Sequence, residues 1–339
     1  MKILTDYHHG NLYYSLHLLF EKRLGHELYR PIGTDWLTRG WWKVAEPYGN
    51  NPDTVKQYLG IDDRHWDAHK NLNGNYKLKD DIYHIYDLEN KISHKAITFD
   101  TFRGMKFDLI IGTHPLHNNW VNLRQYHQKS KFIMQIGNEN QVSDARNILC
   151  STLDFKPTPD QHFIRYHQEI NLDDCKYVPP KNHNKVKSFV VALPDPGVYE
   201  MLKAKLPEFE FRAYGVGSPD GTVSGYKIPK MMQDSAFGYH VKPLDGFGVV
   251  IHKWALSGRP LIVKGSYYTG KLAEPLLIDG VTCIDLDKHT LEESVRMIRE
   301  SAKPENHRKM CRAMYENAKK IIDYDREARE VKKWLDKII

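Results

Sequence analysis

The amino-acid sequence predicts an α/β protein with two domains, each built on a parallel β-sheet flanked by helices. Short apolar runs typical of buried strands alternate with amphipathic helical segments along most of the chain. The 339 residues are enough for two domains of ordinary size. Residues 177–187, with two prolines and several polar side chains, separate two regular regions and are typical of a linker. We therefore expect one domain over residues 1–178 and a second over residues 187–324.

The first domain is expected to begin with a strand, a glycine loop, a helix and a second strand. Residues 2–7 predict the first strand, and Gly10 lies in the loop that follows it, where a backbone without Cβ atoms can approach a ligand. Residues 12–24 carry apolar side chains on one helical face, and residues 26–30 predict the next strand. This order of elements is typical of the start of a Rossmann-like domain.

The region between residues 31 and 100 lacks a regular pattern, and we expect it to be an insertion with one or two helices. Regular structure returns with buried parallel strands at residues 107–112 and 131–137. A helix is expected between them, at residues 123–130.

The second domain repeats the alternation of strands and helices, which predicts a second parallel sheet. Strands are expected at residues 188–193, 210–214, 237–241, 260–263 and 282–285. Helices are expected at residues 198–206, 230–234, 249–256, 291–301 and 307–323. A final helix is expected at residues 325–339, because apolar side chains recur there on one face.

Composition limits the classes of protein to which the chain can belong. No apolar run approaches the ~20 residues that a membrane-spanning helix needs, and the N-terminus lacks the charged and apolar regions of a signal peptide. We therefore expect a soluble protein of the cytoplasm. The four cysteines have no zinc-binding spacing and are expected to be reduced and buried. The formal charge of +6 favours anionic partners only mildly, and nucleotides are among such partners.

The most informative segment is the turn at Asp245, which continues into Gly246, Phe247 and Gly248. The two glycines allow the backbone to come close to a ligand. The helix expected at residues 249–256 has unpaired N–H groups and the positive end of its dipole at this turn. The segment is therefore expected to bind phosphate.

This segment resembles the donor-binding motif of the retaining glycosyltransferases with the GT-B fold. In that family an acidic residue and the sequence GFG open a helix, and a second Glu follows eight positions after the first acidic residue. Asp245 matches the first position, but Lys253 occupies the second, where the family carboxylate binds the ribose hydroxyls. The family also has an Arg and a Lys after the first strand of the C-terminal domain, where this chain has a Pro-Asp-Pro-Gly sequence at residues 194–197. The chain is thus identified as a divergent member of the group.

The resemblance implies two Rossmann-like domains facing each other across a cleft, with residues 325–339 crossing back to the N-terminal domain. The N-terminal domain would bind the acceptor and the C-terminal domain the nucleotide sugar. The implied reaction is transfer of a sugar from a UDP- or GDP-sugar to an acceptor hydroxyl, with retention of the anomeric configuration. Neither a metal ion nor a cofactor is expected beyond the nucleotide-sugar substrate.

Such a transfer requires groups that stabilise the departing diphosphate, because negative charge accumulates there as the bond to the sugar breaks. The family uses backbone N–H groups and basic side chains for this purpose. Since the basic pair after the first strand of the second domain is missing, other lysines are the candidates. These are Lys242, Lys253 and Lys264.

Further donor-binding residues follow from the resemblance. The loop after the strand at residues 260–263 is similar in position to the family loop that contacts the sugar and the phosphates. Its candidate hydrogen-bond donors are Gly265, Ser266 and Thr269. Glu274 is similar in placement to the family's loop glutamate, and Gly10 to the glycine loop of the N-terminal domain.

Two histidines are candidates for a catalytic role. His114 resembles in position the histidine that many retaining members place beside the donor sugar, and His9 follows the first strand of the N-terminal domain. A histidine at the end of a strand can bind a sugar hydroxyl or move a proton near neutral pH.

The acceptor is the least determined part of the prediction. Trp36, Trp41 and Trp42 offer aromatic surfaces that can stack on a saccharide, on a base of DNA or RNA, or on one another in a core. Three functions stay open: a transferase acting on a saccharide or similar acceptor, a transferase that modifies a base of nucleic acid, and a non-catalytic nucleotide- or sugar-binding protein. The sequence does not indicate the oligomeric state.

Overall fold

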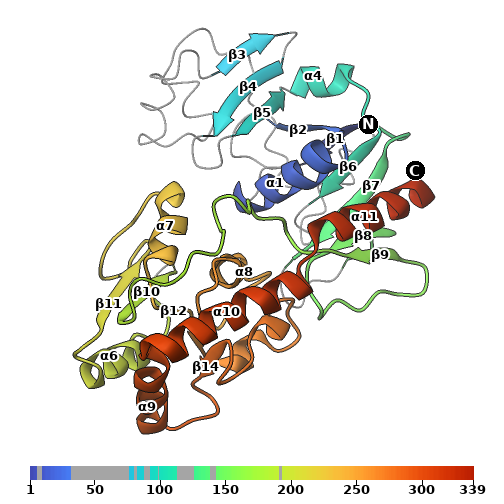
Figure 1. Ribbon diagram of the computed structural model, residues 1–339. Helices are drawn as coiled ribbons and strands as arrows, with labels where there is room; N and C mark the ends of the chain where they lie inside the picture. The colour runs from blue at the N-terminus through green and yellow to red at the C-terminus, as the bar shows by residue number, and fades with distance from the viewer. Residues whose placement is uncertain are drawn as a thin grey trace. The chain divides into compact units, whose positions relative to one another are not determined.

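The computed structural model divides the chain into two compact units (Figure 1). Unit 1 comprises Met1–Ser151, Phe155–Glu169 and Tyr324–Ile339, and unit 2 comprises Thr152–Asp154 and Ile170–Asp323. The residues that the structure describes are 1–5, 10–31, 76–79, 82–87, 92–97, 99–112, 126–137, 143–190 and 193–339.

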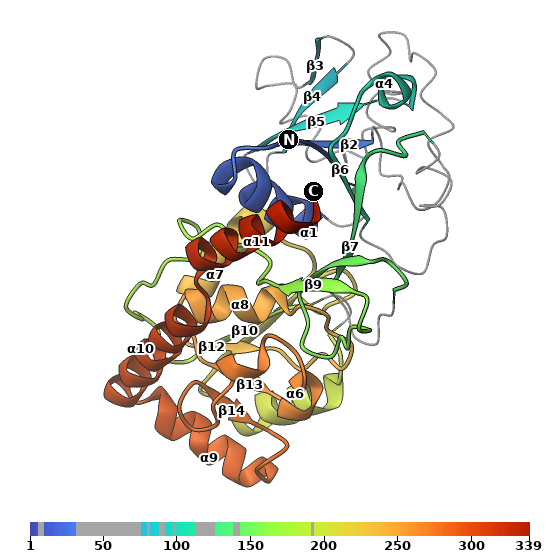
Figure 2. The ribbon, with the colours of Figure 1, turned by 90° about the vertical axis from the view of Figure 1, so that its right-hand side faces the viewer.

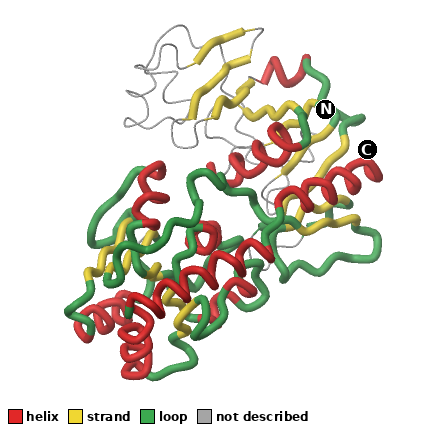
Figure 3. The backbone as a smooth tube through the Cα atoms, in the orientation of Figure 1, coloured by secondary structure: helices red, strands yellow, loops and turns green. Residues whose placement is uncertain are grey.

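Unit 1 contains a sheet of nine strands in the order β3-β4-β5-β2-β1-β6-β7-β8-β9 (Figure 3). The strands are β1 (Lys2–Thr5), β2 (Glu27–Pro31), β3 (Tyr76–Lys79), β4 (Ile82–Asp87), β5 (Ile92–Ile97), β6 (Leu109–Gly112), β7 (Lys131–Ile136), β8 (Asn147–Cys150) and β9 (His162–Arg165). The seven strands from β5 to β9 in this order pair in parallel, whereas β3 and β4 are antiparallel. The predicted parallel sheet of the first domain is therefore present.

The first elements of unit 1 follow the expected order. Strand β1 leads to helix α1 (Gly10–Leu16), which continues as the π-helical segment η1 (His17–Arg23) and is followed by β2. Lys2 of β1 lies opposite Glu27 of β2 in the parallel register. Buried apolar side chains of the helix pack against those of the two strands and form one core cluster with them.

The expectation of one or two helices between residues 31 and 100 stays a prediction, because most of that region lies outside the described residues. Its described part forms the antiparallel strands β3 and β4 and the strand β5, and the short helix α4 (Phe99–Gly104) begins at its end. The sequence of β4, Ile-Tyr-His-Ile-Tyr-Asp, is rich in β-branched and aromatic residues, which favour a strand. Its irregular surroundings obscured this local pattern.

The helix expected at residues 123–130 is wrong in its described part, because residues 126–130 form turns. The His127 ring nitrogen Nε2 lies 2.8 Å from the carbonyl oxygen of Phe102, and the Ser130 hydroxyl donates to the carbonyl oxygen of Phe107. Side chains that bond to the backbone in this way compete with helix formation.

The C-terminal helix α11 (Tyr324–Ile338) belongs to unit 1, as the resemblance implied (Figure 2). Its buried face contributes Ala328, Val331, Trp334 and Leu335 to the core cluster of that unit. Polar contacts at its start add to this packing, since the Glu327 carboxylate accepts a hydrogen bond of 2.7 Å from the backbone N–H of His167. The helix is thus part of the first core although it ends the sequence.

Unit 2 contains five parallel strands in the order β11-β10-β12-β13-β14. The strands are β10 (Lys185–Phe189), β11 (Glu210–Tyr214), β12 (Phe237–Tyr239), β13 (Leu261–Val263) and β14 (Cys283–Asp285). The connecting elements are the helices α6 (Pro196–Lys205), α7 (Ile228–Gln233), α8 (Val249–Leu256), α9 (Leu291–Ala302) and α10 (Pro304–Ile321), with the 3₁₀ turns η4 (Gly225–Lys227), η5 (Gly265–Tyr268) and η6 (Glu274–Leu276). The expected alternation of strands and helices is confirmed.

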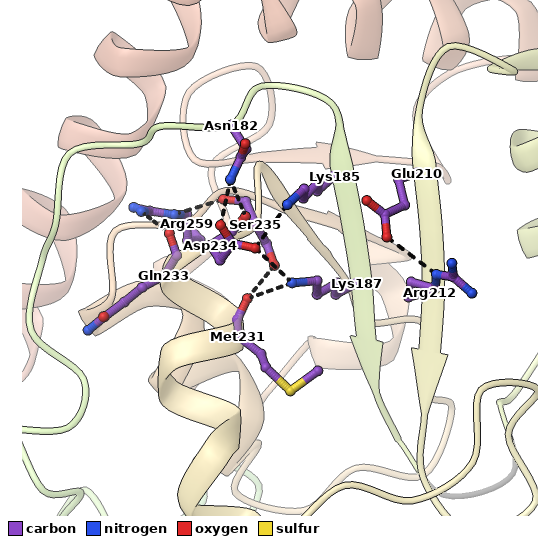
Figure 4. A network of polar contacts seen from close by, with 10 residues as sticks. All are labelled: Asn182, Lys185, Lys187, Glu210, Arg212, Met231, Gln233, Asp234, Ser235 and Arg259. Atoms are coloured by element: carbon purple, nitrogen blue, oxygen red, sulfur yellow. Dashed lines mark hydrogen bonds and ion pairs between the residues drawn. The ribbon is translucent and has the colours of Figure 1, made fainter.

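Strand β10 begins three residues before its expected start and so lies partly inside the segment taken as a linker. Lysines at positions 185 and 187 made this segment look like a polar loop. In the structure both ammonium groups contact the Asp234 carboxylate, at 3.1 Å for Lys185 and 3.5 Å for Lys187 (Figure 4). Burial lowers the pKa of Lys187, and the contact with Asp234 offsets part of this effect.

The same network accounts for a buried arginine at the amino end of β13. Arg259 is fully buried and donates hydrogen bonds to the backbone carbonyls of Gln233, Ser235, Ser257 and Gly258 (Figure 4 shows the first two). Burial lowers the pKa of its guanidinium. These buried cations lie at the amino ends of the strands and are satisfied by the protein itself, so they are not available to a ligand.

The packing of α11 predicts a large effect of truncating its aromatic anchor. Trp334→Ala should lower the free energy of unfolding by about 3–5 kcal/mol, because a buried indole is replaced by a cavity. Chemical denaturation followed by circular dichroism measures this change. Lys333→Ala, at the exposed neighbouring position, is the matched control and should change stability by less than about 0.5 kcal/mol. Equal effects of the two substitutions would contradict the packing described.

Candidate functional site

The strand order of unit 2 indicates where a ligand would bind. Strand β10 lies between β11 and β12, so the chain leaves β10 toward one side of the sheet and returns to the other side at β12. In open parallel sheets, ligands bind outside the carboxyl ends of the strands at such a switch point. The segments concerned here are the loop that leads from β10 to Asp195 and residues 240–248 after β12.

The turn after β12 is organised by Asp245, whose side chain is buried. Its Oδ2 atom lies 2.8 Å from Nε2 of His240, and its Oδ1 atom accepts a hydrogen bond of 3.0 Å from Nζ of Lys242. Burial by itself would raise the pKa of the Asp245 carboxyl, but the hydrogen bonds and the charges of these two neighbours outweigh it and hold the pKa well below its usual range. Asp245 therefore carries a negative charge at neutral pH.

Helix α8 starts at Gly248, which has a left-handed backbone conformation with φ of +78°. A Cβ atom at this position would lie 3.3 Å from Cβ of Ala273, so both the conformation and the space favour glycine. No side chain caps this helix, and within the described part of the chain the N–H groups of Val249 and Val250 have no hydrogen-bond partner. Such a helix start is suited to an anion.

Two contacts fix the position of α8. Trp254 is fully buried against β12, where a Cβ atom on Gly238 would lie only 2.5 Å from the indole. Phe247 is also buried, and its ring stacks on that of His252 with 4.0 Å between the centroids. The side chain of Phe247, a predicted donor-binding residue, is thus an anchor of the turn, and only its backbone can take part in binding.

Lys264 follows β13, and its ammonium group pairs with the Asp195 carboxylate in the loop after β10. Since β12 lies between these two strands, the ion pair spans the carboxyl end of β12. The hydrogen bond that Lys264 donates to Asp195 is the main reason that the pKa of Lys264 is raised. Asp195 itself has a left-handed φ of 53° and does not cap α6. Lys264 therefore contacts the Pro-Asp-Pro-Gly segment at residues 194–197, where the family has its Arg and Lys and this chain has neither.

The glycine loop after β13 is bonded to carboxylates of the protein. The N–H of Gly265 donates to Oδ1 of Asp285 at 2.7 Å, and the N–H and hydroxyl of Ser266 donate to Oδ2 of Asp287 at 3.0 and 2.6 Å. Two of the predicted donor-binding residues thus have their donors engaged in this structure.

The remaining predicted residues of this region lie apart from these contacts. Thr269 is exposed after η5 and has no hydrogen bond with another described residue, and the Glu274 carboxylate accepts a hydrogen bond of 2.7 Å from the N–H of Gly270. Lys253 is half-buried in the last turn of α8, and its ammonium group forms no hydrogen bond or ion pair with a described residue. Burial raises the pKa of the Cys175 thiol to about 11, and the charge of Lys253 counteracts this rise.

The predicted residues of the first domain fall mostly outside the described part of the chain. Gly10 is the first residue of α1. His9, His114, Trp36, Trp41 and Trp42 lie outside the described residues, so their catalytic and acceptor-binding roles stay predictions.

Sequence reasoning missed His240, which bonds to Asp245, and Asp195, which pairs with Lys264. A signal for His240 was present, because a polar residue directly after an apolar strand lies at the carboxyl edge of a parallel sheet. Asp195 gave no such signal, since its partner lies 69 residues away.

Several further expectations can be compared with the described residues. All four cysteines are free and buried, as expected. No group of three or more His, Cys, Asp or Glu side chains in the described ranges could hold a metal ion. No helix in that same part of the protein has the length and apolar character needed to cross a membrane.

No family model matches the chain, and no curated protein sequence matches it either. Solved structures match over almost the whole chain. A glycosyltransferase from Rickettsia africae is 11% identical, with 99% of this chain and 98% of that chain covered and a TM-score of 0.63. HepE of Anabaena in complex with UDP-glucose is 10% identical, with 99% and 100% covered and a TM-score of 0.61. The pneumococcal O-GlcNAc transferase GtfA in complex with UDP and GlcNAc is 10% identical, with 100% and 99% covered and a TM-score of 0.58.

The chain has the GT-B fold. The resemblance inferred from the Asp245 turn is thereby confirmed at the level of fold, by structures that share about a tenth of their residues with this chain. Within the GT-B fold, unit 2 carries the turn that resembles the donor-binding motif, at the carboxyl end of its central strand β12.

The left-handed start of α8 predicts that Gly248 cannot be replaced without cost. Gly248→Ala should lower the free energy of unfolding by about 1–2 kcal/mol, because a residue with a Cβ atom is strained in this conformation. Thermal or chemical denaturation measures the loss. Gly197→Ala is the matched control, since an added Cβ atom there has no neighbour within 4 Å in the described structure. If both variants were equally stable, the left-handed turn would not be required.

Proposed function

We propose that the protein is a glycosyltransferase that moves a sugar from a nucleotide-sugar donor to an acceptor hydroxyl. The fold is that of enzymes with this activity, and three of the solved structures named above are transferases or carry UDP or UDP-glucose. Because UDP or a UDP-sugar is bound in two of them, UDP is the first nucleotide to test, with GDP as the second.

The observation that carries this proposal is the uncapped start of α8 beside Lys242 and Asp245. Unpaired N–H groups, the helix dipole and a lysine side chain meet at the switch point of the sheet. The helices α6, α7 and α10 also begin without a side-chain cap, whereas α9 begins with a capping box formed by Thr290 and Glu293. The start of α8 is assigned to the donor diphosphate because it combines an uncapped helix start with the contact between Lys242 and Asp245.

The chemistry assigned to this site is stabilisation of the leaving group. As the bond between the sugar and the diphosphate breaks, N–H groups of α8 and the ammonium groups of Lys242 and Lys264 bind the charge that develops on the phosphate oxygens. We assign Gly246, Gly248 and the loop at residues 265–269 to the sugar and phosphates, and Lys253 to the phosphates of the donor. Retention of configuration and independence of metal ions belong to the proposal.

The acceptor belongs to the proposal only as a class. A saccharide or similar hydroxyl acceptor is favoured, because the solved structures with this fold include transferases crystallised with sugars. His114 and His9 are proposed to bind or deprotonate hydroxyl groups, and the tryptophans between residues 36 and 42 to stack on the acceptor.

The proposal is tested with a panel of UDP- and GDP-sugars, by thermal shift and by release of the nucleotide. A nucleotide present at about 100 times its Kd should raise Tm by about 5 °C or more, and at least one sugar donor should be hydrolysed slowly without an acceptor. The proposal is overturned if no nucleotide raises Tm and no donor is turned over.

Reversal of the charge at Lys253 provides a test of the altered motif. Lys253→Glu should weaken binding of UDP by about tenfold or more, because a carboxylate replaces a cation beside the nucleotide. Isothermal titration calorimetry measures the change. Lys309→Glu, at an exposed position of α10, is the control with the same change of charge and should leave the Kd unaltered. Unchanged binding by the Lys253 variant would remove this residue from the site.

A further inference from the structure

Hydrogen bonds of both its backbone and its ring hold His240 in place. Its side chain is only 1% exposed, and its backbone N–H donates to the carbonyl oxygen of Ile262 at 3.0 Å. Its carbonyl oxygen accepts a hydrogen bond of 2.8 Å from the hydroxyl of Tyr268. The ring is thus fixed at the carboxyl end of β12, from where Nε2 reaches the Asp245 carboxylate. Among the described residues, Nδ1 has no hydrogen-bond partner, so the contact with Asp245 is the polar function of this ring.

The Asp245 carboxylate transmits this fixed position to Lys242. One oxygen bonds to the buried His240 and the other to the ammonium group of Lys242, whose side chain is 37% exposed. The three side chains therefore form a series that runs from the interior of the protein to its surface. A Cβ atom on Gly248 would lie 3.8 Å from Oδ2 of Asp245, so the series passes directly beside the start of α8.

We propose that His240 is a positioning residue of the donor site. It fixes the Asp245 carboxylate, which in turn holds the Lys242 ammonium beside the start of α8, and Lys242 binds the donor diphosphate there. The inference rests on the proposed function. It adds a role for His240 and separates the residues of the turn that hold Lys242 in position from Lys242, which contacts the ligand. Asp245 acts mainly through Lys242, and the group that meets the ligand is a cation.

A held lysine binds an anion more tightly than a free one. A lysine side chain loses up to about 2 kcal/mol of conformational free energy when it is immobilised, and a contact formed before the ligand arrives removes part of this loss from the binding step. Asp245 can provide the contact only while its own orientation is fixed, and a carboxylate without its histidine partner could rotate away. His240 therefore affects nucleotide affinity although it does not touch the nucleotide.

The test compares two replacements of His240. Leucine removes the hydrogen bond to Asp245, whereas glutamine retains an amide N–H at a similar distance from the backbone. His240→Leu should raise the Kd for UDP by about fivefold to tenfold, and His240→Gln should recover most of the lost affinity. Titration calorimetry measures the Kd values, and Tm is recorded in parallel to separate binding from stability.

A double-mutant cycle with Lys242→Met distinguishes positioning from general support of the fold. If His240 acts through Lys242, the leucine variant should change the Kd less than about twofold once Lys242 is absent. The same loss of affinity in both backgrounds would overturn the inference. Should His240→Leu fail to fold, His240→Met, which also has no side-chain N–H group to bond to Asp245, replaces it in the cycle, and the same two outcomes decide.

The cycle also separates this inference from the proposed function. If the unaltered protein bound neither UDP nor GDP, the proposed function itself would fail, and with it the role of His240. If the unaltered protein binds UDP but the two substitutions act independently, only the positioning role of His240 is refuted. Lys309→Met serves as the control for loss of a lysine outside the site and should leave the Kd unchanged.

Discussion

The candidate site depends on the two contacts that hold the buried carboxylate of Asp245 in one orientation. A carboxylate that leaves water is unfavourable unless donors replace the lost hydrogen bonds, and His240 and Lys242 provide them here. With both oxygens bonded, the turn enters α8 through the left-handed Gly248 in a single orientation. The unpaired N–H groups at the start of the helix consequently lie at the carboxyl end of the central strand, next to an ammonium group.

Other polar and charged groups around the sheet of unit 2 are already bonded to other parts of the protein. At the amino ends of the strands, Arg259 is bonded to backbone carbonyls and cannot serve a ligand. At the carboxyl ends, the N–H of Gly265 is taken by Asp285, and Lys264 is paired with Asp195. The start of α8 is therefore the candidate anion site, although α6 also begins without a side-chain cap, and both Lys242 and Lys264 are paired with carboxylates that a bound anion would have to share or replace. In the proposed donor site, these groups take the place of the basic pair that the family has after its first C-terminal strand.

Local patterns allowed much of unit 2 to be predicted from the sequence. The helix at residues 249–256 has its expected bounds, because glycine and serine residues mark its ends. The start of β10 was missed, since Lys185 and Lys187 look like loop residues until Asp234 is placed beside them by the fold. The turn at Asp245 was predicted as a candidate site, but its partner His240 was not, because hydrogen bonds of buried side chains depend on tertiary structure that no periodicity encodes.

The claim that the start of α8 holds the diphosphate is tested most directly by hydrogen exchange of its first backbone amides. In the free protein the N–H groups of Val249 and Val250 have no partner among the described residues and should exchange rapidly. Saturation with UDP should slow their exchange by about tenfold or more, because phosphate oxygens accept their hydrogen bonds. Unchanged exchange of both amides while UDP is bound would show that the nucleotide binds elsewhere and would contradict the account.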